Sequence, residues 1–139
     1  MANFLVMGAG GFIGQHLTTE LLRQGEQVTA IGHEVHMLEE SERLTVVSGE
    51  IDSELLGSLE KPKYIYFLLG GSSVASSMNC PVVDFNKTFQ PLTALLEKLK
   101  HDWADSQLIF ISSAAVYGNN ASQSTSISSA CCLLYTSDA

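Results

Sequence analysis

The 139-residue sequence predicts an α/β fold built on a doubly wound parallel sheet. Short apolar segments alternate with segments of helical periodicity from residue 4 to residue 111, which is typical of parallel strands joined by crossover helices. A glycine-rich stretch also joins the first apolar segment directly to the first helical one. Because such crossovers are right-handed, the expected strand order is 3-2-1-4-5. We expect one domain over residues 1–120, truncated after about the fifth strand, and a disordered or artefactual tail over residues 121–139.

Five apolar segments predict the strands, at residues 4–7, 28–31, 44–47, 64–69 and 108–111. The fourth segment is nearly all apolar, so we expect that strand to be buried on both faces of the sheet. After Asn119 the periodicity disappears into a serine-rich run that extends from Ser122 to Ser129.

Two helices are predicted from the spacing of apolar side chains. Ile13, Leu17 and Leu21 lie four residues apart, and this first helix should end at Gly25. The second helix is indicated by a stripe of apolar residues that step by four, three, four and three: Phe85, Phe89, Leu92, Leu96 and Leu99. Pro91 lies inside this stripe, where it should kink the helix or cost a few kcal/mol unless it is accommodated.

The composition indicates a globular chain and excludes several classes of function. Apolar residues make up 45% of the chain, and no apolar run reaches the roughly 18 to 20 residues that a bilayer span needs. The N-terminus shows no signal pattern, so we expect a cytoplasmic protein without a membrane segment. The net charge of −8 repels phosphate backbones and argues against nucleic-acid binding. Cys80, Cys131 and Cys132 show no metal-ligand spacing, so no metal site is expected.

Gly8, Gly11 and Gly14 are spaced three residues apart, between the first expected strand and the first expected helix. Glycine permits a tight turn, lets backbone approach a pyrophosphate, and lets a helix and a strand pack closely. The helix N-terminus adds free N–H groups and the positive end of the helix dipole. This stretch therefore predicts a Rossmann-like dinucleotide site, with a purely structural turn as the alternative.

A second motif follows in the fifth expected strand and the residues after it. Together with the Gly-x-x-Gly-x-x-Gly spacing, the run Phe110-Ile111-Ser112-Ser113-Ala114-Ala115-Val116-Tyr117-Gly118 resembles the extended branch of the short-chain dehydrogenases/reductases, the NAD-dependent epimerase/dehydratase family. The resemblance covers residues 3 to about 120. It implies NAD or NADP as the cofactor and a nucleotide-linked sugar as the substrate, and it leaves open a homodimer of the intact parent.

The position of Ser113 in this motif matches the catalytic serine or threonine of the family. Its hydroxyl would hydrogen-bond the substrate oxygen that gains or loses a proton as hydride moves at the adjacent carbon. The alternative is that Ser112 and Ser113 only satisfy backbone groups at a strand end. The acid/base of the family is a Tyr followed four residues later by a Lys, and the 139 residues contain no such pair. We therefore expect this chain by itself to be catalytically inactive.

The resemblance also implies which residues contact the cofactor. They are Gly8, Gly11, Phe12, Ile13, Gly14, Gly32, His33, Glu50, Ile51, Leu68, Leu69, Gly70, Ser72 and Thr88. At the end of the second strand, NAD-specific members place an Asp, whereas this sequence has Gly32-His33-Glu34. Glu34 could serve NAD if the turn shifts, and His33 could approach a 2′-phosphate. The choice between NAD and NADP therefore stays open.

Residues 132–139 have no counterpart in the family and resemble one reading-frame translation of a transposase adapter used in preparing sequencing libraries. We expect the gene to have been cut inside the serine-rich stretch. The leading hypothesis is the cofactor-binding part of a nucleotide-sugar epimerase or dehydratase. Two alternatives remain, a non-catalytic NAD(P)-binding module and an NADPH-dependent ketone reductase of the extended branch.

Overall fold

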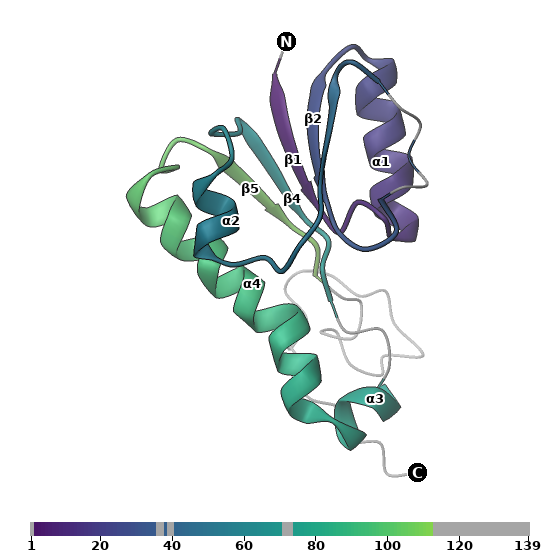
Figure 1. Ribbon diagram of the computed structural model, residues 1–139, viewed down its shortest axis with the longest axis vertical. Coiled ribbons are helices and arrows are strands. Elements are labelled where there is room, and N and C mark those ends of the chain that lie inside the picture. The colour runs from purple at the N-terminus through teal and green to yellow at the C-terminus, as the bar shows by residue number, and fades with distance from the viewer. Residues whose placement is uncertain (1, 36–37, 39–40, 71–73, 113–139) are drawn as a thin grey trace, which may run out of the picture.

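The computed structural model describes residues 2–35, 38, 41–70 and 74–112, and these form a five-stranded parallel sheet with helices on both faces (Figure 1). The strands are β1 (Asn3–Met7), β2 (Gln27–Ile31), β3 (Leu44–Val47), β4 (Tyr64–Phe67) and β5 (Gln107–Phe110). Their order is β3-β2-β1-β4-β5, and each neighbouring pair is parallel. The predicted fold class, strands and strand order are therefore confirmed, with strand ends that agree within two residues.

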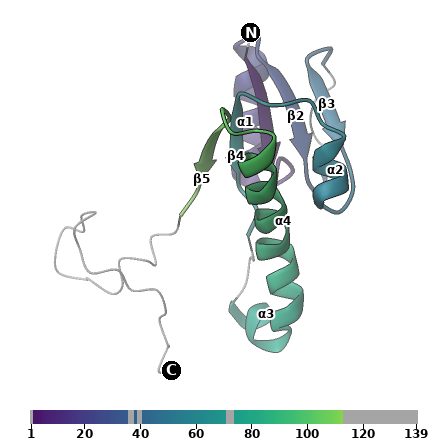
Figure 2. The ribbon, with the colours of Figure 1, turned by 90° about the vertical axis from the view of Figure 1, so that its left-hand side faces the viewer.

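β1 lies at the centre of the sheet, and its side chains alternate between two apolar clusters. Because successive side chains of a strand point to opposite faces, Leu5 and Met7 share one cluster while Phe4 and Val6 share the other. The Leu5 cluster includes side chains of α2 (Ser53–Gly57) and α4 (Pro81–His101), and the Phe4 cluster includes side chains of α1 (Phe12–Arg23). The sheet is therefore covered by α1 on one face and by α2 and α4 on the other (Figure 2).

α1 contains the predicted apolar face and ends close to the stop expected at Gly25. It ends at Arg23, and Gly25 follows with a φ of +83°, a left-handed conformation that glycine adopts without strain. On its exposed face, Arg23 contacts Glu20 at 2.7 Å, and Gln24 donates a hydrogen bond to the same carboxylate at 2.7 Å. These hydrogen bonds, that from Arg23 first, lower the pKa of Glu20 to about 2.

Two short helices, α2 and α3 (Val74–Asn79), were not predicted from the sequence. Each has at most six residues, too few for apolar periodicity to register. The N-cap of α2 is Asp52, whose side chain accepts a hydrogen bond from the backbone N–H of Leu55 at 2.8 Å, and this residue was the local signal for the helix. No helix of the described residues is long and apolar enough to cross a membrane.

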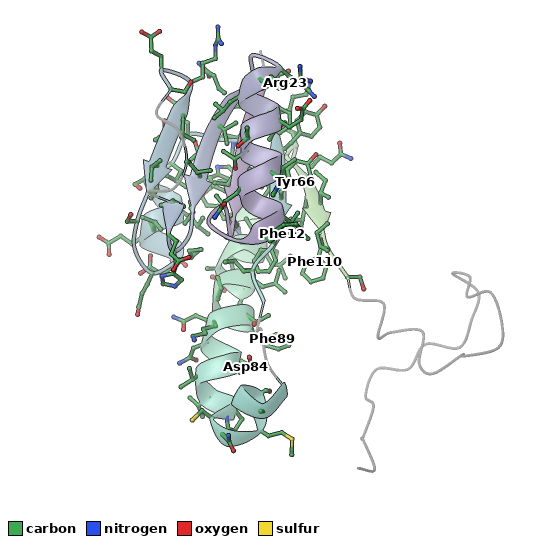
Figure 3. The ribbon with its side chains drawn as sticks, turned by 90° about the vertical axis from the view of Figure 1, so that its right-hand side faces the viewer. Phe12, Arg23, Tyr66, Asp84, Phe89 and Phe110 are labelled. Carbon is green, nitrogen blue, oxygen red and sulfur yellow. The ribbon has the colours of Figure 1, made fainter. Side chains whose placement is uncertain are left out.

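The predicted apolar stripe of α4 is only partly correct. Leu92 and Leu99 pack against the core, but Phe85, Phe89 and Leu96 are about half exposed. The buried side chains of α4 are instead Pro91, Ala94 and Leu95. The predicted and the observed apolar stripes have the same helical spacing and differ by a small rotation about the helix axis. Only packing against the sheet determines which of the two is buried. In addition, the first half of α4, which carries Phe89, extends past the end of the sheet (Figures 1 and 3).

Two further expectations from the sequence concern Pro91 in α4 and the burial of β4. α4 continues through Pro91 from Pro81 to His101, so the proline does not end the helix. The expectation that β4 is buried on both faces is wrong, because Tyr64 and Tyr66 are only partly buried while Ile65 and Phe67 are fully buried. The two tyrosines lie on the α1 face, where the Phe4 ring stacks on them at centroid distances of 5.0 and 6.4 Å. Within the described residues, α1 packs on β1 and β2 and leaves this side of β4 partly uncovered.

Candidate functional site

The candidate site lies at the carboxyl ends of β1 and β4, where the strand order reverses. The chain moves outward from β1 through β2 to β3 and then returns to β4 on the other side of β1. The connection after β1 passes over one face of the sheet through α1, and the connection after β4 passes over the other through α4. In doubly wound sheets, this divergence leaves the crevice in which ligands bind.

The glycine loop that follows β1 is attached to the end of β2. The backbone N–H groups of Gly8 and Ala9 both donate to the carbonyl of Ile31, at 2.7 and 3.0 Å. Gly8 has a φ of +93°, and a Cβ placed on it would lie 3.1 Å from the carbonyl carbon of Leu68, the residue that follows β4. The loop is therefore held between the ends of β2 and β4, and Gly8 is required by both its backbone angle and its neighbours.

Gly14 allows α1 to lie directly on the loop. A Cβ at this position would stand 2.1 Å from the carbonyl oxygen of Gly8 and 2.7 Å from the Cα of Ala9. No side chain fits in that space. The close helix-to-strand contact predicted from the glycine spacing is therefore present in the structure.

Gly11 has a different reason to be glycine. It is the N-cap of α1, its φ is −74°, and the nearest atom to a Cβ placed there would be the Gly8 oxygen at 3.4 Å. An alanine would therefore fit the fold. Among the described residues, no side chain caps α1 by a hydrogen bond, which leaves its first backbone N–H groups available to an anion. The space that a Gly11 side chain would fill is therefore open to a ligand and is not needed for packing within the protein.

A cavity opens at the loop. Its volume of about 350 Å³ lies within the range of small-ligand sites. Its lining residues come from the loop, the first turn of α1 and the ends of β4 and β5: Gly8, Gly11, Phe12, Ile13, Gly14, Phe67, Leu68, Leu69 and Ile111. Seven of these were expected to contact a cofactor, and the structure brings them together. Phe12 is 82% exposed at the rim, and Figure 3 shows it at the same end of the sheet as Phe110.

Phe67 and Ile111 also line the cavity and were not among the cofactor contacts expected from the sequence. Both stand at or just after the carboxyl end of a parallel strand, which is the signal that could have identified them.

Two other residues hold the loop and were likewise not anticipated. A Cβ on Gly10 would lie 1.6 Å from the carbonyl oxygen of His33, so Gly10 packs directly on the turn after β2. The side-chain amide of Gln15 donates to the carbonyl of Gly10 at 2.7 Å. The sequence signal for Gly10 was its place in the Gly8-Ala9-Gly10-Gly11 run, whereas the Gln15 contact depends on tertiary geometry.

The remaining expected contacts lie outside the cavity lining. Gly32 and His33 pack by their backbone against the glycine loop. Glu50 is exposed, and Ile51 packs on the core next to α2. Gly70, three residues after the end of β4, is exposed. Thr88 lies on α4 with its Oγ1 buried and without a hydrogen-bond partner in the described part of the chain.

Ser72 and Ser113 lie outside the described residues, so the structure does not place the expected catalytic serine. Across the ranges 2–35, 38, 41–70 and 74–112, no group of three His, Cys, Asp or Glu residues could hold a metal ion. The described site is therefore a cradle of backbone and apolar side chains. Its chemistry suits the binding of a phosphate-containing ligand with flat apolar rings.

The sequence and the structure both match known proteins. A family model described as "NAD dependent epimerase/dehydratase family" matches residues 4–133. The crystal structure of UDP-glucose-4-epimerase from Stenotrophomonas maltophila with bound NAD and formylated UDP-arabinopyranose is 26% identical, with a TM-score of 0.79 over 96% of this chain. No curated protein matches the chain.

Two further solved structures show the same likeness. A UDP-glucose 4-epimerase is 26% identical with a TM-score of 0.71 over 84% of this chain. The Bordetella bronchiseptica enzyme WbmF in complex with NAD+ is 25% identical with a TM-score of 0.71 over 86% of this chain. The chain spans only 37% to 44% of the length of these three proteins.

Proposed function

Because the chain belongs to the NAD-dependent epimerase/dehydratase family, we propose that it is the cofactor-binding part of an enzyme that acts on nucleotide-linked sugars. Residues 1–120 would form an incomplete NAD(P)-binding domain, with residues 121–139 as a tail outside it. In the whole protein, hydride would move between the nicotinamide cofactor and a carbon of the sugar. The solved relatives support this substrate class, since they include a UDP-glucose-4-epimerase that holds NAD and formylated UDP-arabinopyranose.

The cradle at the start of α1 is the observation that carries the proposal. Gly14 lets the helix rest on the loop, and Gly11 leaves its first N–H groups uncovered although the fold would accept an alanine there. These N–H groups carry partial positive charge and hold phosphate oxygens. We therefore assign the pyrophosphate of the dinucleotide to the backbone of Phe12 and Ile13.

The other residues of the site would have simpler roles. Phe67, Leu69 and Ile111 form the apolar part of the cavity wall and would exclude water beside the cofactor. When bound, the nicotinamide would accept and return hydride at the sugar carbon. Ser113, as the family resemblance implies, would donate a hydrogen bond to the substrate oxygen at that carbon. No Tyr in these 139 residues is followed four positions later by a Lys, so we expect the chain by itself to bind cofactor without turning over substrate.

Titration of the 139-residue chain with NAD+ by isothermal calorimetry tests the proposal, with Gly11→Ala as the decisive variant. Within the described residues a Cβ at Gly11 meets no atom closer than 3.4 Å, so the thermal midpoint should fall by only a few degrees, the cost of alanine at an N-cap. The methyl group would stand where the pyrophosphate approaches the helix, so the affinity for NAD+ should fall by about tenfold or more. Gly57→Ala is the matched control, because a Cβ there has no atom of the described part of the chain within 4 Å and Gly57 does not line the cavity.

Two results would contradict the proposal. The first is a wild-type chain that is folded by circular dichroism and binds neither NAD+ nor NADP+. The second is a Gly11→Ala variant that binds NAD+ as well as the Gly57→Ala control. Formation of an epimerised or dehydrated UDP-sugar by the purified chain would separately refute the expected inactivity.

A further inference from the structure

The glycine loop is held in part by a side chain of the helix that follows it. The hydrogen bonds that the structure describes in the stretch 8–11 join backbone groups, with one exception. The N–H of Gly11, for example, donates to the carbonyl of Gly8 at 3.1 Å. The exception is the carbonyl of Gly10, which accepts a hydrogen bond of 2.7 Å from the side-chain amide of Gln15 in α1. One long polar side chain therefore takes a place that backbone fills elsewhere in the loop.

The Gln15 bond acts on the peptide that joins Gly10 to Gly11, immediately before the first turn of α1. Neither residue has a Cβ, so this peptide rotates with less steric resistance than a peptide between two residues with side chains. Its N–H is held by the carbonyl of Gly8 and its carbonyl by Gln15. Gln15 is itself fixed in the helix, because its backbone N–H donates to the carbonyl of Gly11 at 2.9 Å. The most easily rotated peptide of the loop is therefore tied at both ends.

We propose that Gln15 is a positioning residue of the cofactor site, which orders the glycine loop before the pyrophosphate binds. The proposal rests on the proposed function, because it assumes that a dinucleotide occupies the cradle. Rotation of the peptide between Gly10 and Gly11 would tilt the N-cap from which the N–H of Phe12 projects. It would also free a carbonyl oxygen, whose partial negative charge opposes a phosphate nearby. By holding that oxygen, Gln15 removes an ordering cost that the ligand would otherwise have to offset.

The lining of the cavity indicates that Gln15 acts through the loop and not by touching the ligand. Gly11 and Gly14 line the cavity, whereas Gly10 and Gln15 are not among the described residues that line it. Gly10 also packs on the turn after β2, since a Cβ there would lie 1.6 Å from the carbonyl oxygen of His33. Gly10 is thus held at its Cα by that turn and at its carbonyl by Gln15. Both contacts reach the cavity only through the backbone of the loop.

Calorimetric titration of the 139-residue chain with NAD+ tests the role of Gln15 through the variant Gln15→Met. Methionine keeps a long unbranched side chain and a similar helix propensity but cannot donate to the Gly10 carbonyl. The affinity for NAD+ should fall about fivefold, the effect of one net hydrogen bond that no longer orders the loop. ADP-ribose keeps the pyrophosphate without the nicotinamide, so its affinity should fall by the same factor.

Gln24→Met is the matched control for Gln15→Met. The amide of Gln24 donates to the carboxylate of Glu20 at 2.7 Å, so this variant also removes one side-chain hydrogen bond from α1, at the end opposite the loop. It should bind NAD+ and ADP-ribose as wild type does.

Exchange of backbone amide hydrogens, followed by NMR without ligand, separates positioning of the loop from a general loss of stability. The N–H of Gly11 should exchange about fivefold faster in Gln15→Met, while the amides of β1 at the centre of the sheet keep their wild-type rates. A general loss of stability would instead speed exchange in β1 as well, and it would leave the affinity of the folded chain for NAD+ unchanged.

The outcomes separate the role of Gln15 from the proposed function. A folded wild-type chain that binds neither NAD+ nor NADP+ overturns both. If wild type binds NAD+ and Gln15→Met binds it as well as the Gln24→Met control, only the role of Gln15 is wrong. A loss of NAD+ affinity with unchanged exchange at Gly11, or with full affinity for ADP-ribose, would show that Gln15 does not act by ordering the loop at the pyrophosphate, and this too overturns the proposal.

Discussion

Replacing Gly14 by alanine is the sharpest test of how the glycine loop is built. The added Cβ would stand 2.1 Å from the carbonyl oxygen of Gly8 and less than 3.0 Å from two atoms of Ala9, all of them backbone. To restore an ordinary contact, the start of α1 must move away from the loop by about 1 Å. That movement strains the packing of Thr18 and Leu21, which α1 buries against the sheet.

The expected cost is at the upper end of the overpacking range, about 3 kcal/mol in the free energy of unfolding. For a domain of this size the thermal midpoint should fall by about 10 °C. Urea unfolding followed by circular dichroism measures the free energy, and the same signal gives the midpoint on heating. Gly57→Ala should instead gain a few tenths of a kcal/mol, because it removes glycine from a helix end with open space around it. If Gly14→Ala stays within about 0.5 kcal/mol of wild type, the close helix-to-loop contact is not what the structure indicates.

Three further predictions concern the helices. Leu95→Ala should lower the free energy of unfolding by about 3 kcal/mol, whereas Leu96→Ala should lower it by less than about 0.5 kcal/mol because Leu96 is 49% exposed. Equal costs in urea unfolding would contradict the finding that α4 buries Leu95 rather than Leu96. Pro91→Ala should raise the free energy of unfolding by about 1 kcal/mol, since the regained backbone N–H contributes more than the lost ring carbons. A lower free energy of unfolding in urea would show that burial of the ring contributes more than the hydrogen bond. The Arg23 hydrogen bond places the pKa of Glu20 at about 2, below its ordinary value of 4.5, so its stabilisation should be complete above pH 4.5 and vanish toward pH 2. The thermal midpoint of wild type should accordingly exceed that of Glu20→Gln above pH 4.5 and converge with it at pH 2, a small difference because the pair is exposed.

Local patterns in the chain were sufficient for the fold and for the centre of the site. Alternating apolar segments specified the five strands and their order, because crossover handedness leaves few arrangements of parallel strands. The spacing of Gly8, Gly11 and Gly14 located the cavity, since only glycine meets the needs of a tight turn, a close helix and an open approach. These features depend on residues that are near one another in the sequence.

The remaining features of the fold and the site depend on packing between segments that are far apart in the sequence. The rotation of α4, which buries Leu95 and exposes Phe89, depends on where the sheet ends, and no periodicity within the helix records that position. The partial exposure of Tyr66 likewise reflects which strands α1 covers. The turn after β2 is the clearest case. A Cβ on Gly10 would lie 1.6 Å from the carbonyl oxygen of His33, and no local pattern in either segment records that contact between two backbones. Steric exclusion of this kind is a property of two segments brought together, so neither segment contains it alone.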